Sequence, residues 1–320
     1  MAAVQGWGTR VGLGAESTYG TAVPRTAFLE VVSVDLNKKS TLLPGETLAG
    51  ASTTYEAAHR DRMLTEAGGS MQVVPEYEGQ GLLWQHLMGN TASTSGSGPY
   101  VHTLHLAWTM SPLTTEVVHG TAVQGGSTVS EVFDGGMCTS WSLSCTVGQR
   151  AKLDTTWIHE DSAGPAGSPT SATYTTNRLR MLGHEITLVW NSTTFKVYNF
   201  RLGVDRALER DYPLGSRLTL QPMSTRGALV TFEAEIRLED WALPIAQHAA
   251  TSATGTLTIS DGTNSFVFTL RQLAWDEAMV SHSSQGKQTV RVRGQGLGST
   301  SASTVGLTLV ATNSQSSFTA

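Results

Sequence analysis

Charged side chains are scarce in this sequence, and basic ones most of all. Asp, Glu, Lys and Arg make up 15% of the 320 residues, against about 25% in an average soluble domain. The formal net charge is -5. Proteins that grip DNA or RNA need a stripe of cationic side chains to displace the counterions around the phosphates. The chain has no such stripe, which argues against tight nucleic-acid binding.

Long apolar runs and cysteine pairs are also missing. No apolar run approaches the roughly 18 residues that a membrane-spanning helix requires, and the first residues lack the basic and apolar parts of a secretory signal. Cys138 and Cys145 lie seven positions apart in one alternating segment. On a strand they would be about 23 Å apart, beyond the reach of a disulfide. We expect two buried thiols, no disulfide and no membrane span.

What the sequence has in quantity is the alternation of apolar and polar residues with a period of two. In residues 230–239 apolar side chains alternate with Thr, Glu and Arg, which is typical of an antiparallel strand with one buried face. We therefore expect an all-β fold class. Three pairs of such segments flank turn residues and predict hairpins, namely 141–147 with 151–157, 186–190 with 195–204, and 257–259 with 266–270.

Helical patterning is confined to two short segments, Gly81–Met88 and Asp240–Ala250. Each follows a strand pattern that carries two glutamates, and a shift of 157 positions places segment 73–84 on segment 230–241 without a gap. Residues 32–36 and 198–202 are a further similar pair upstream. The aligned positions are Val73 with Val230, Glu76 with Glu233, Glu78 with Glu235, and Trp84 with Trp241.

These parallels predict a chain that arose by duplication. A stretch rich in Pro, Gly and Ser at 162–176 is typical of a linker. We expect an N-terminal arm at 1–20, a first β-domain at 21–161 and a second β-domain at 177–320. Each domain is expected to be a β-sandwich or half-barrel with one short helix and long loops.

No group of residues forms a recognisable catalytic or metal-binding motif. Two glutamates on one strand face lie roughly 7 Å apart, as in some glycosidases, but those enzymes draw their carboxylates from opposite sides of the sugar. His102 and His105 are three positions apart, so on a strand they point to opposite faces and form no metal pair. The glycine-rich segments at 6–12 and 286–287 lack the phosphate-loop patterns. We expect no enzyme activity, no cofactor and no metal.

Sheets built from hairpins expose strand edges, which are an aggregation hazard unless they are paired or protected. A protein that polymerises can use them, because pairing edges between subunits closes a barrel. The glutamate pairs would give an acidic face that either lines a channel and repels DNA phosphates or only keeps the surface soluble. The long segment 38–69 suits contacts with a neighbouring ring. The channel-facing candidates are Glu76, Glu78, Glu233 and Glu235, and the inter-ring candidates are Lys38, Lys39, Glu46, Tyr55, Arg60 and Arg62.

Four further segments follow one another along the chain. Gly12–Asn37 contains Glu-x-x-Tyr-Gly-Thr before a strand, and Gly68–Asn90 contains a strand and a helix ending in Leu-x-Gly. Phe133–Asp161 reads as a central hairpin, and Tyr212–Asp240 combines a Leu-Gly-Ser loop with a strand that ends in an acidic pair. Together, in this order, they resemble the tail tube (major tail) proteins of long-tailed bacteriophages, although residues 96–126 match no part of that pattern.

The resemblance implies a structural virion protein without catalytic residues. Members of that family form stacked rings around a lumen that conducts genomic DNA from capsid to host, with six copies of the fold per ring. Two copies in this chain imply a ring of three chains, and one copy implies a hexamer. The resemblance also implies a location in the phage tail after assembly in the host cytoplasm, and passage of DNA without specific binding. The implied partners are the tape-measure, tail terminator and distal tail proteins.

Two other interpretations stay open from the sequence alone. The chain could be another virion β-domain, such as a capsid decoration or baseplate protein, which would form discrete particles rather than tubes. It could also be a carbohydrate-binding adhesin module, since it contains eight tryptophans. We expect Trp141, Trp157 and Trp190 to pack in the core instead, because they are in phase with the apolar face of their strands.

Overall fold

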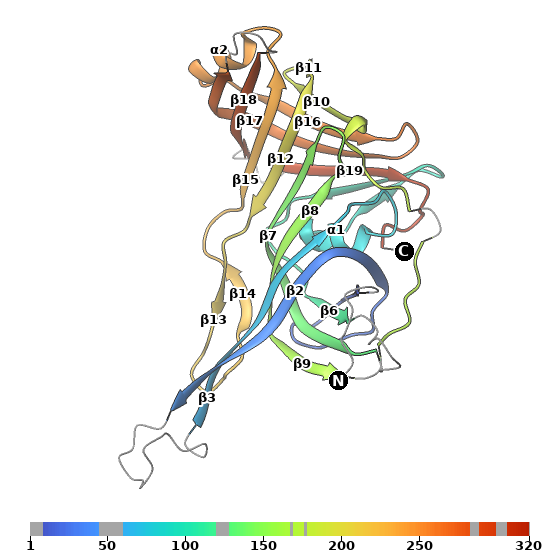
Figure 1. The fold of residues 1–320 in the computed structure, drawn as a ribbon, viewed down its shortest axis with the longest axis vertical. Helices are drawn as coiled ribbons and strands as arrows, with labels where there is room; N and C mark the ends of the chain where they lie inside the picture. The colour runs from blue at the N-terminus through green and yellow to red at the C-terminus, as the bar shows by residue number, and fades with distance from the viewer. Residues whose placement is uncertain are drawn as a thin grey trace.

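The computed structural model describes residues 9–44, 60–119, 128–166, 169–175, 178–281, 288–298 and 306–319. Within these ranges the chain is mostly antiparallel β-structure, which confirms the all-β prediction (Figure 1). Helix α1 spans Gly81–Met88, as predicted, and α2 spans Ala242–His248. A short 3-10 turn, η2, covers Gly183–Glu185. None of the helices in the described ranges is long and apolar enough to cross a membrane.

The strands follow the alternating segments of the sequence. The first half contains β1 (Arg10–Ala15), β2 (Ala27–Pro44), β3 (Arg60–Val73), β4 (Ser93–Ser95), β5 (Tyr100–His105), β6 (Leu113–Val118), β7 (Ser130–Thr146), β8 (Lys152–His159) and β9 (Asp161–Ala166). The second half contains β10 (Ile186–Trp190), β11 (Thr193–Phe195), β12 (Val197–Asp205), β13 (Leu208–Asp211), β14 (Leu220–Ser224), β15 (Leu229–Arg237), β16 (Ser252–Ser260), β17 (Ser265–Ser281), β18 (Thr289–Leu297) and β19 (Leu307–Asn313).

Two of the three predicted hairpins form as expected. β7 and β8 pair across a turn in which Gly148 has a φ of +78°, a value that favours glycine. β16 and β17 pair across the turn at Gly262. The third prediction is only half right, because β10 turns back into the short strand β11, whereas β12 leaves to join other strands.

Eight strands form one continuous antiparallel sheet, which we call the long sheet. Their order is β2-β3-β8-β7-β12-β15-β18-β17. The first four strands come from the first half of the chain and the last four from the second half. β7 and β12 lie side by side in the middle of the sheet and join the two halves (Figure 1).

One face of the long sheet is apolar and covered by a second layer. β7 and β17 are long strands whose N-terminal parts leave the long sheet, where β7 pairs with β6 and β9, and β17 pairs with β16 and β19. Helix α1 lies within this second layer (Figure 1). The buried apolar side chains form one cluster that includes Trp141, Trp157 and Trp190, which confirms that these tryptophans belong to the core.

The two halves repeat the same order of strands. β2-β3-β8-β7 in the first half follows the same sequence of neighbours as β12-β15-β18-β17 in the second. A β-bulge interrupts the pairing at the equivalent place in each half, which fixes the correspondence between residues. The bulges lie at Val31/Ser33 in β2 and Val197/Asn199 in β12, and at Cys138/Ser140 in β7 and Trp275/Glu277 in β17.

The correspondence between the halves differs from the one read off the sequence. The similarity of residues 32–36 to 198–202 agrees with the bulges, but β3 and β15 then align with Ser70 on Glu233. The predicted shift of 157 positions, which places Glu76 on Glu233, is therefore wrong for these strands. The cause is a longer connection between strand and helix in the first half, where β3 ends at Val73 and α1 begins at Gly81.

Three segments that were expected to be an arm, a linker and a loop contain β-structure. β1, from the expected arm at 1–20, pairs with β2 and β6. β9 begins the expected linker at 162–176 and pairs with β7. The expected loop at 38–69 contains the paired ends of β2 and β3. Residues 38–44 and 60–69 form a protruding hairpin that we call the arm (Figure 1), while residues 45–59 lie outside the described ranges. The division into two domains stays a prediction.

Candidate functional site

The face of the long sheet that points away from the core is polar. Its side chains come from every second position of each strand, because successive residues of a strand point to opposite faces. A shallow hollow near its centre is lined by residues that include Asp154, Arg201 and Glu233. We call this surface the polar face. Its charged residues are Asp35, Lys39, Glu66, Lys152, Asp154, Arg201, Asp205, Glu233, Glu235, Arg237, Glu277, Arg291 and Arg293.

Acidic and basic side chains alternate across the polar face. Arg201 on β12 lies opposite Glu233 on β15, and Glu233 lies opposite Arg293 on β18. Arg293 in turn lies opposite Glu277 on β17. The Glu233 carboxylate is 3.2 Å from Arg293 Nε and 3.9 Å from Arg291 Nη2. These pairs are partly exposed, so each stabilises the fold by less than about 1 kcal/mol, and their main effect is to balance the local charge.

Glu233 and Glu235 both lie on the polar face, at alternate positions of β15. Glu235 accepts a hydrogen bond of 2.8 Å from the side-chain amide of Asn199 on β12. The expectation of an acidic surface around them is wrong, because the polar face holds arginines and lysines in nearly equal number to its carboxylates. Reasoning along one strand at a time missed Arg201, Arg291 and Arg293, although all three occupy polar positions in alternating segments.

Glu76 and Glu78 do not lie on the polar face, and the expectation that they share an exposed strand face is wrong. β3 ends at Val73, so both glutamates lie in the loop before α1, where they are 4% and 5% exposed. Glu78 accepts hydrogen bonds from the backbone N–H and the hydroxyl group of Ser314, at 3.2 and 2.6 Å. Both carboxylates therefore hold the loop in place.

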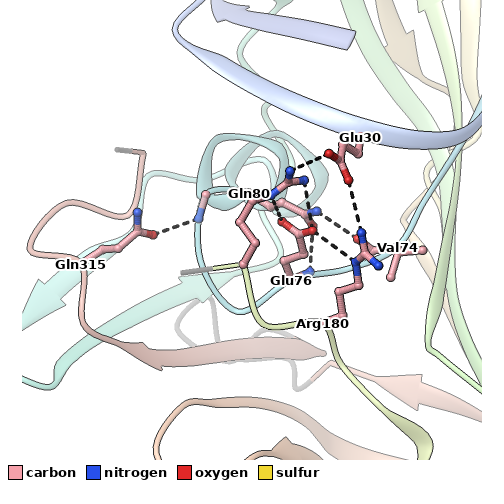
Figure 2. A network of polar contacts seen from close by, with 8 residues as sticks. Glu30, Val74, Glu76, Gln80, Arg180 and Gln315 are labelled. Carbon is pink, nitrogen blue, oxygen red and sulfur yellow. Dashed lines mark hydrogen bonds and ion pairs between the residues drawn. The ribbon is translucent and has the colours of Figure 1, made fainter. Parts of the chain in front are cut away.

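The Glu76 carboxylate lies between two arginines from the start of the second half, an arrangement that we call the clamp (Figure 2). It is 3.1 Å from Arg178 Nε and 3.7 Å from Arg180 Nε. The same arginines reach Glu30 of β2 at 2.7 and 3.2 Å, and hydrogen bonding to Arg178 lowers the pKa of Glu30. Gln80 accepts a hydrogen bond from the backbone N–H of Glu76. The clamp ties the second half to β2 and to the loop before α1.

The arm contains those predicted inter-ring residues that the structure describes. Lys39 and Arg62 are exposed on it. Lys38 is directed back to its own chain, because its ammonium group lies 2.5 Å from a carboxylate oxygen of Asp161. A contact of Lys38 with another ring would have to break this pair. Outside the described residues or side chains lie Glu46, Tyr55 and the side chain of Arg60.

The arm has an apolar character that was not expected from the sequence. Leu42, Leu43, Met63 and Leu64 are between 37% and 47% exposed on its two strands. The signal was present in the sequence as two pairs of adjacent large apolar residues, which break the alternation expected of a strand with one wet face. Several exposed large apolar side chains on one protruding element are typical of a contact surface.

Both outer strands of the long sheet have open edges. β2 pairs with β1 over residues 27–30 and from Val31 onward with β3 alone, within the described part of the chain. In the same part of the chain, β17 pairs beyond Trp275 with β18 alone. Unpaired backbone N–H and C=O groups along such edges are templates for a further strand. The two edges are therefore candidate interaction surfaces.

The remaining chemically notable residues have structural partners. Among the described residues no three His, Cys, Asp or Glu are placed to hold a metal ion. Cys138 and Cys145 are free and buried, as predicted, and burial raises the pKa of the Cys138 thiol to about 12. His102 is buried and 3.1 Å from the side-chain oxygen of Asn313, whereas His105 is exposed. These groups bind the chain to itself.

The comparisons with known proteins fit this architecture. The family model described as phage tail tube protein matches residues 6–315, a range that contains every strand of the long sheet, the arm and both open edges. No curated protein matches the chain. A match over nearly the whole chain, on an all-β fold with open sheet edges, shows that the chain belongs to the phage tail tube protein family and is a structural protein of the phage tail.

Proposed function

We propose that copies of this chain polymerise into stacked rings that form the tail tube, and that the polar face lines a conduit for genomic DNA. The observation that carries this proposal is the long sheet, which has one face on the core, one polar face and two open edges. Pairing of edges between copies closes the sheet into a barrel without free edges. The second layer covers the apolar face and would lie on the outside of the barrel, so the polar face would point into the lumen.

The repeated order of strands supports a ring of three chains with two tail-tube-like units each. The units would correspond to residues 21–161 and 177–320. Three long sheets would give a closed barrel of twenty-four strands. With strands about 4.8 Å apart and tilted by about 40°, that barrel is about 50 Å across at the backbone. A hexamer of the same chains would be about twice as wide, so the diameter of the lumen discriminates between the two rings.

The alternating charges of the polar face support passage of DNA without specific binding. Every arginine in the row through Glu233 has a carboxylate opposite it on a neighbouring strand. Phosphates bind tightly where cationic side chains form a continuous strip that releases counterions. Carboxylates that interrupt the strip repel the phosphates next to each arginine, so no position on the wall holds the DNA.

The arm is the element best suited to reach a neighbouring ring. It protrudes beyond the long sheet and has exposed apolar side chains on both of its strands (Figure 1). We propose that Leu42, Leu43, Met63 and Leu64 supply most of the buried area of this contact. Arg62 would lie at its polar rim. The other inter-ring candidates from the sequence are Lys38, Lys39, Glu46, Tyr55 and Arg60.

Further partners are proposed from the family alone. A tape-measure protein would occupy the lumen while the tube grows, and terminator and distal tail proteins would close its two ends. Assembly would take place in the host cytoplasm, before the tail joins the virion.

Electron microscopy of the purified chain at increasing concentration tests the proposal. We expect rings at low concentration and tubes at high concentration, with a lumen of constant width. The double variant Leu42→Ser with Leu43→Ser should still form rings but should grow few tubes, because the side chains that it removes are exposed in the single chain. Solitary monomers at all concentrations, and in extracts of virions, would contradict the proposed function.

A further inference from the structure

We propose that β17 of one chain pairs with β2 of the next chain in the register that β7 and β12 use within a single chain. The inference rests on the proposed function and deepens it, because it names the two edges that meet and the residues that face one another. The occupant of each open edge is a second copy of this chain.

The junction between β7 and β12 is a template for this contact because the two halves correspond residue by residue. Aligned on their bulges, Ser140 of β7 corresponds to Glu277 of β17, and Asp205 of β12 corresponds to Lys39 of β2. With this alignment, the residue pairs between neighbouring strands of the first half correspond to those between the equivalent strands of the second half. Examples are Ser70–Thr156 with Glu233–Arg293, Gln72–Asp154 with Glu235–Arg291, and Val73–Leu153 with Ile236–Val290.

Applied to the open edges, the register of β7 and β12 predicts which residues of β17 and β2 lie opposite one another. Within one chain Ser140 lies opposite Asp205. Exchanging each residue for its counterpart places Glu277 of one chain opposite Lys39 of the next. Antiparallel pairing then fixes the neighbours in both directions. The further pairs are Ala278 with Lys38, Met279 with Asn37, Val280 with Leu36, and Ser281 with Asp35.

The side chains that this register brings together match in charge. This match is independent of the register, which was derived from backbone pairing alone. Glu277 and Lys39 have opposite charges and are both exposed, and neither has an ion-pair partner within the described part of the chain. Glu277 already lies opposite Arg293, and Lys39 opposite Glu66. The row of alternating charges on the polar face therefore continues across the junction without two like charges meeting.

On the opposite face of the junction, Ala278 lies opposite the aliphatic stem of Lys38, and one pair is apolar on both sides. Val280 and Leu36 are half-buried and pack against the core of their own chain, and in this register they lie opposite one another. A slip of one residue would bring side chains from opposite faces together, and would place one of these apolar side chains opposite a polar residue. The register is thus specified by both faces of the sheet.

A backbone acceptor at the internal junction has a counterpart on β17 that no strand of the described chain occupies. The Thr139 carbonyl accepts a hydrogen bond of 2.8 Å from the backbone N–H of Arg206, just beyond the end of β12. The corresponding residues are Asp276 and Ser40. In the single chain the Asp276 carbonyl is contacted by the side-chain amide of Gln247 at 3.4 Å, a long bond that an incoming strand can replace.

The helices beside the two junctions differ as the inference requires. At the internal junction Trp84 of α1 is fully buried and packs against Phe266 and Phe268, which belong to the second half. α2 follows β15 as α1 follows β3, and it lies beside the open part of β17. Trp241, the N-cap residue of α2, and Ile245 within the helix are 54% and 64% exposed. A neighbouring chain on β17 would cover α2 as the second half covers α1.

Thiol cross-linking tests the register directly in assembled tubes. The double variant Glu277→Cys with Lys39→Cys places one thiol on each edge, and mild oxidation should join most chains to their neighbours. A denaturing gel should then show covalent multimers, ending at three if the ring is a trimer. The buried Cys138 and Cys145 should leave the wild-type chain uncross-linked.

A matched pair separates this register from simple proximity. Glu277→Cys with Asp35→Cys uses the same face of β2 but lies four residues away, about 13 Å along the strand. We expect at least tenfold less cross-linking. Equal or better cross-linking of this pair, or cross-linking by Glu277→Cys alone, would overturn the inference while the tubes still support the proposed function. Failure of wild-type chains to assemble would overturn the proposed function and the inference together.

Charge exchange gives a second test that needs no cross-link. Glu277→Lys or Lys39→Glu alone puts like charges opposite each other and should raise the critical concentration for assembly about threefold or more. The double variant restores opposite charges and should return to within about twofold of the wild type. A double variant that assembles worse than either single variant would contradict the pairing.

Discussion

The clamp around Glu76 and the polar face around Glu233 both pair carboxylates with arginines, but under opposite conditions of exposure. In the clamp the Glu76 side chain is 5% exposed, whereas Glu233 is 32% exposed and its partner Arg293 58%. Because it is buried, the clamp stabilises the fold: a carboxylate or guanidinium group left there without a partner is poorly solvated by water. On the polar face the same pairs add little stability and instead balance the charge of the exposed surface.

Removal of the Glu76 charge should give the largest loss of stability. Glu76→Gln removes one of the two carboxylates that Arg178 and Arg180 share and leaves them only Glu30. A fully buried pair costs about 3–5 kcal/mol to break, but the arginines are 22% and 38% exposed, which reduces the expected loss to about 2 kcal/mol. Denaturant unfolding of the unassembled chain measures this loss. Glu233→Gln is the control and should cost less than about 0.5 kcal/mol. Equal losses would erase the distinction between the two regions.

A buried histidine extends the comparison to pH. His159 is fully buried beside Phe133 and Trp157, and burial lowers its pKa to about 3. His159 of the unfolded chain binds a proton near pH 6.5, whereas His159 of the folded chain stays neutral. The contribution of neutral His159 to the free energy of unfolding is therefore fully present above pH 6.5 and is lost as the pH falls toward about 3. The slope is about 1.4 kcal/mol per pH unit in that window.

His159→Gln should therefore flatten the loss of stability between pH 6.5 and 5.5 by about 1 kcal/mol. Unfolding free energies of the variant and the wild type at several pH values measure the difference in slope, which is independent of any constant cost of the substitution. The exposed His105→Gln variant is the control and should keep the wild-type slope. Parallel curves for all three proteins would show that His159 is not the group that senses the pH.

Much of the β-structure was predictable because periodicity records which face of a strand is buried. Residues 230–239 predicted β15, and the segments around Gly148 predicted the β7–β8 hairpin. The helix at Gly81–Met88 was predicted to the residue. In each of these segments local sequence and tertiary contacts favour the same structure.

The rest depended on contacts that a single strand does not reveal. Glu76 looks like a strand residue, but the strand ends at Val73 because the following loop bonds to residues 178–182 and 314–315 far along the chain. The correspondence of Ser70 with Glu233 was hidden by the unequal connections before the two helices. Arg291 and Arg293 were missed because their role on the polar face appears only once β15 and β18 are paired.

Of the substitutions proposed, reversal of the charge of two glutamates on the polar face should affect stability least. It is also the most direct test of the polar face. In the double variant Glu233→Lys with Glu235→Lys, Arg201, Arg291 and Arg293 lose their intervening carboxylates, and a cationic strip forms across β12, β15 and β18. Stability should change by less than about 1 kcal/mol, because the residues are partly exposed, and tubes should still form.

Triggered DNA release from phage that contains this variant should nevertheless be slower, because the cationic strip attracts phosphates and releases counterions. Added salt should restore the rate, since it screens the interaction and removes the gain from counterion release. Glu233→Gln with Glu235→Gln is the intermediate control, with a smaller delay and a weaker dependence on salt. Release at the wild-type rate in low salt would show that β15 does not face the DNA, and the polar face would then have to lie on the outside of the ring.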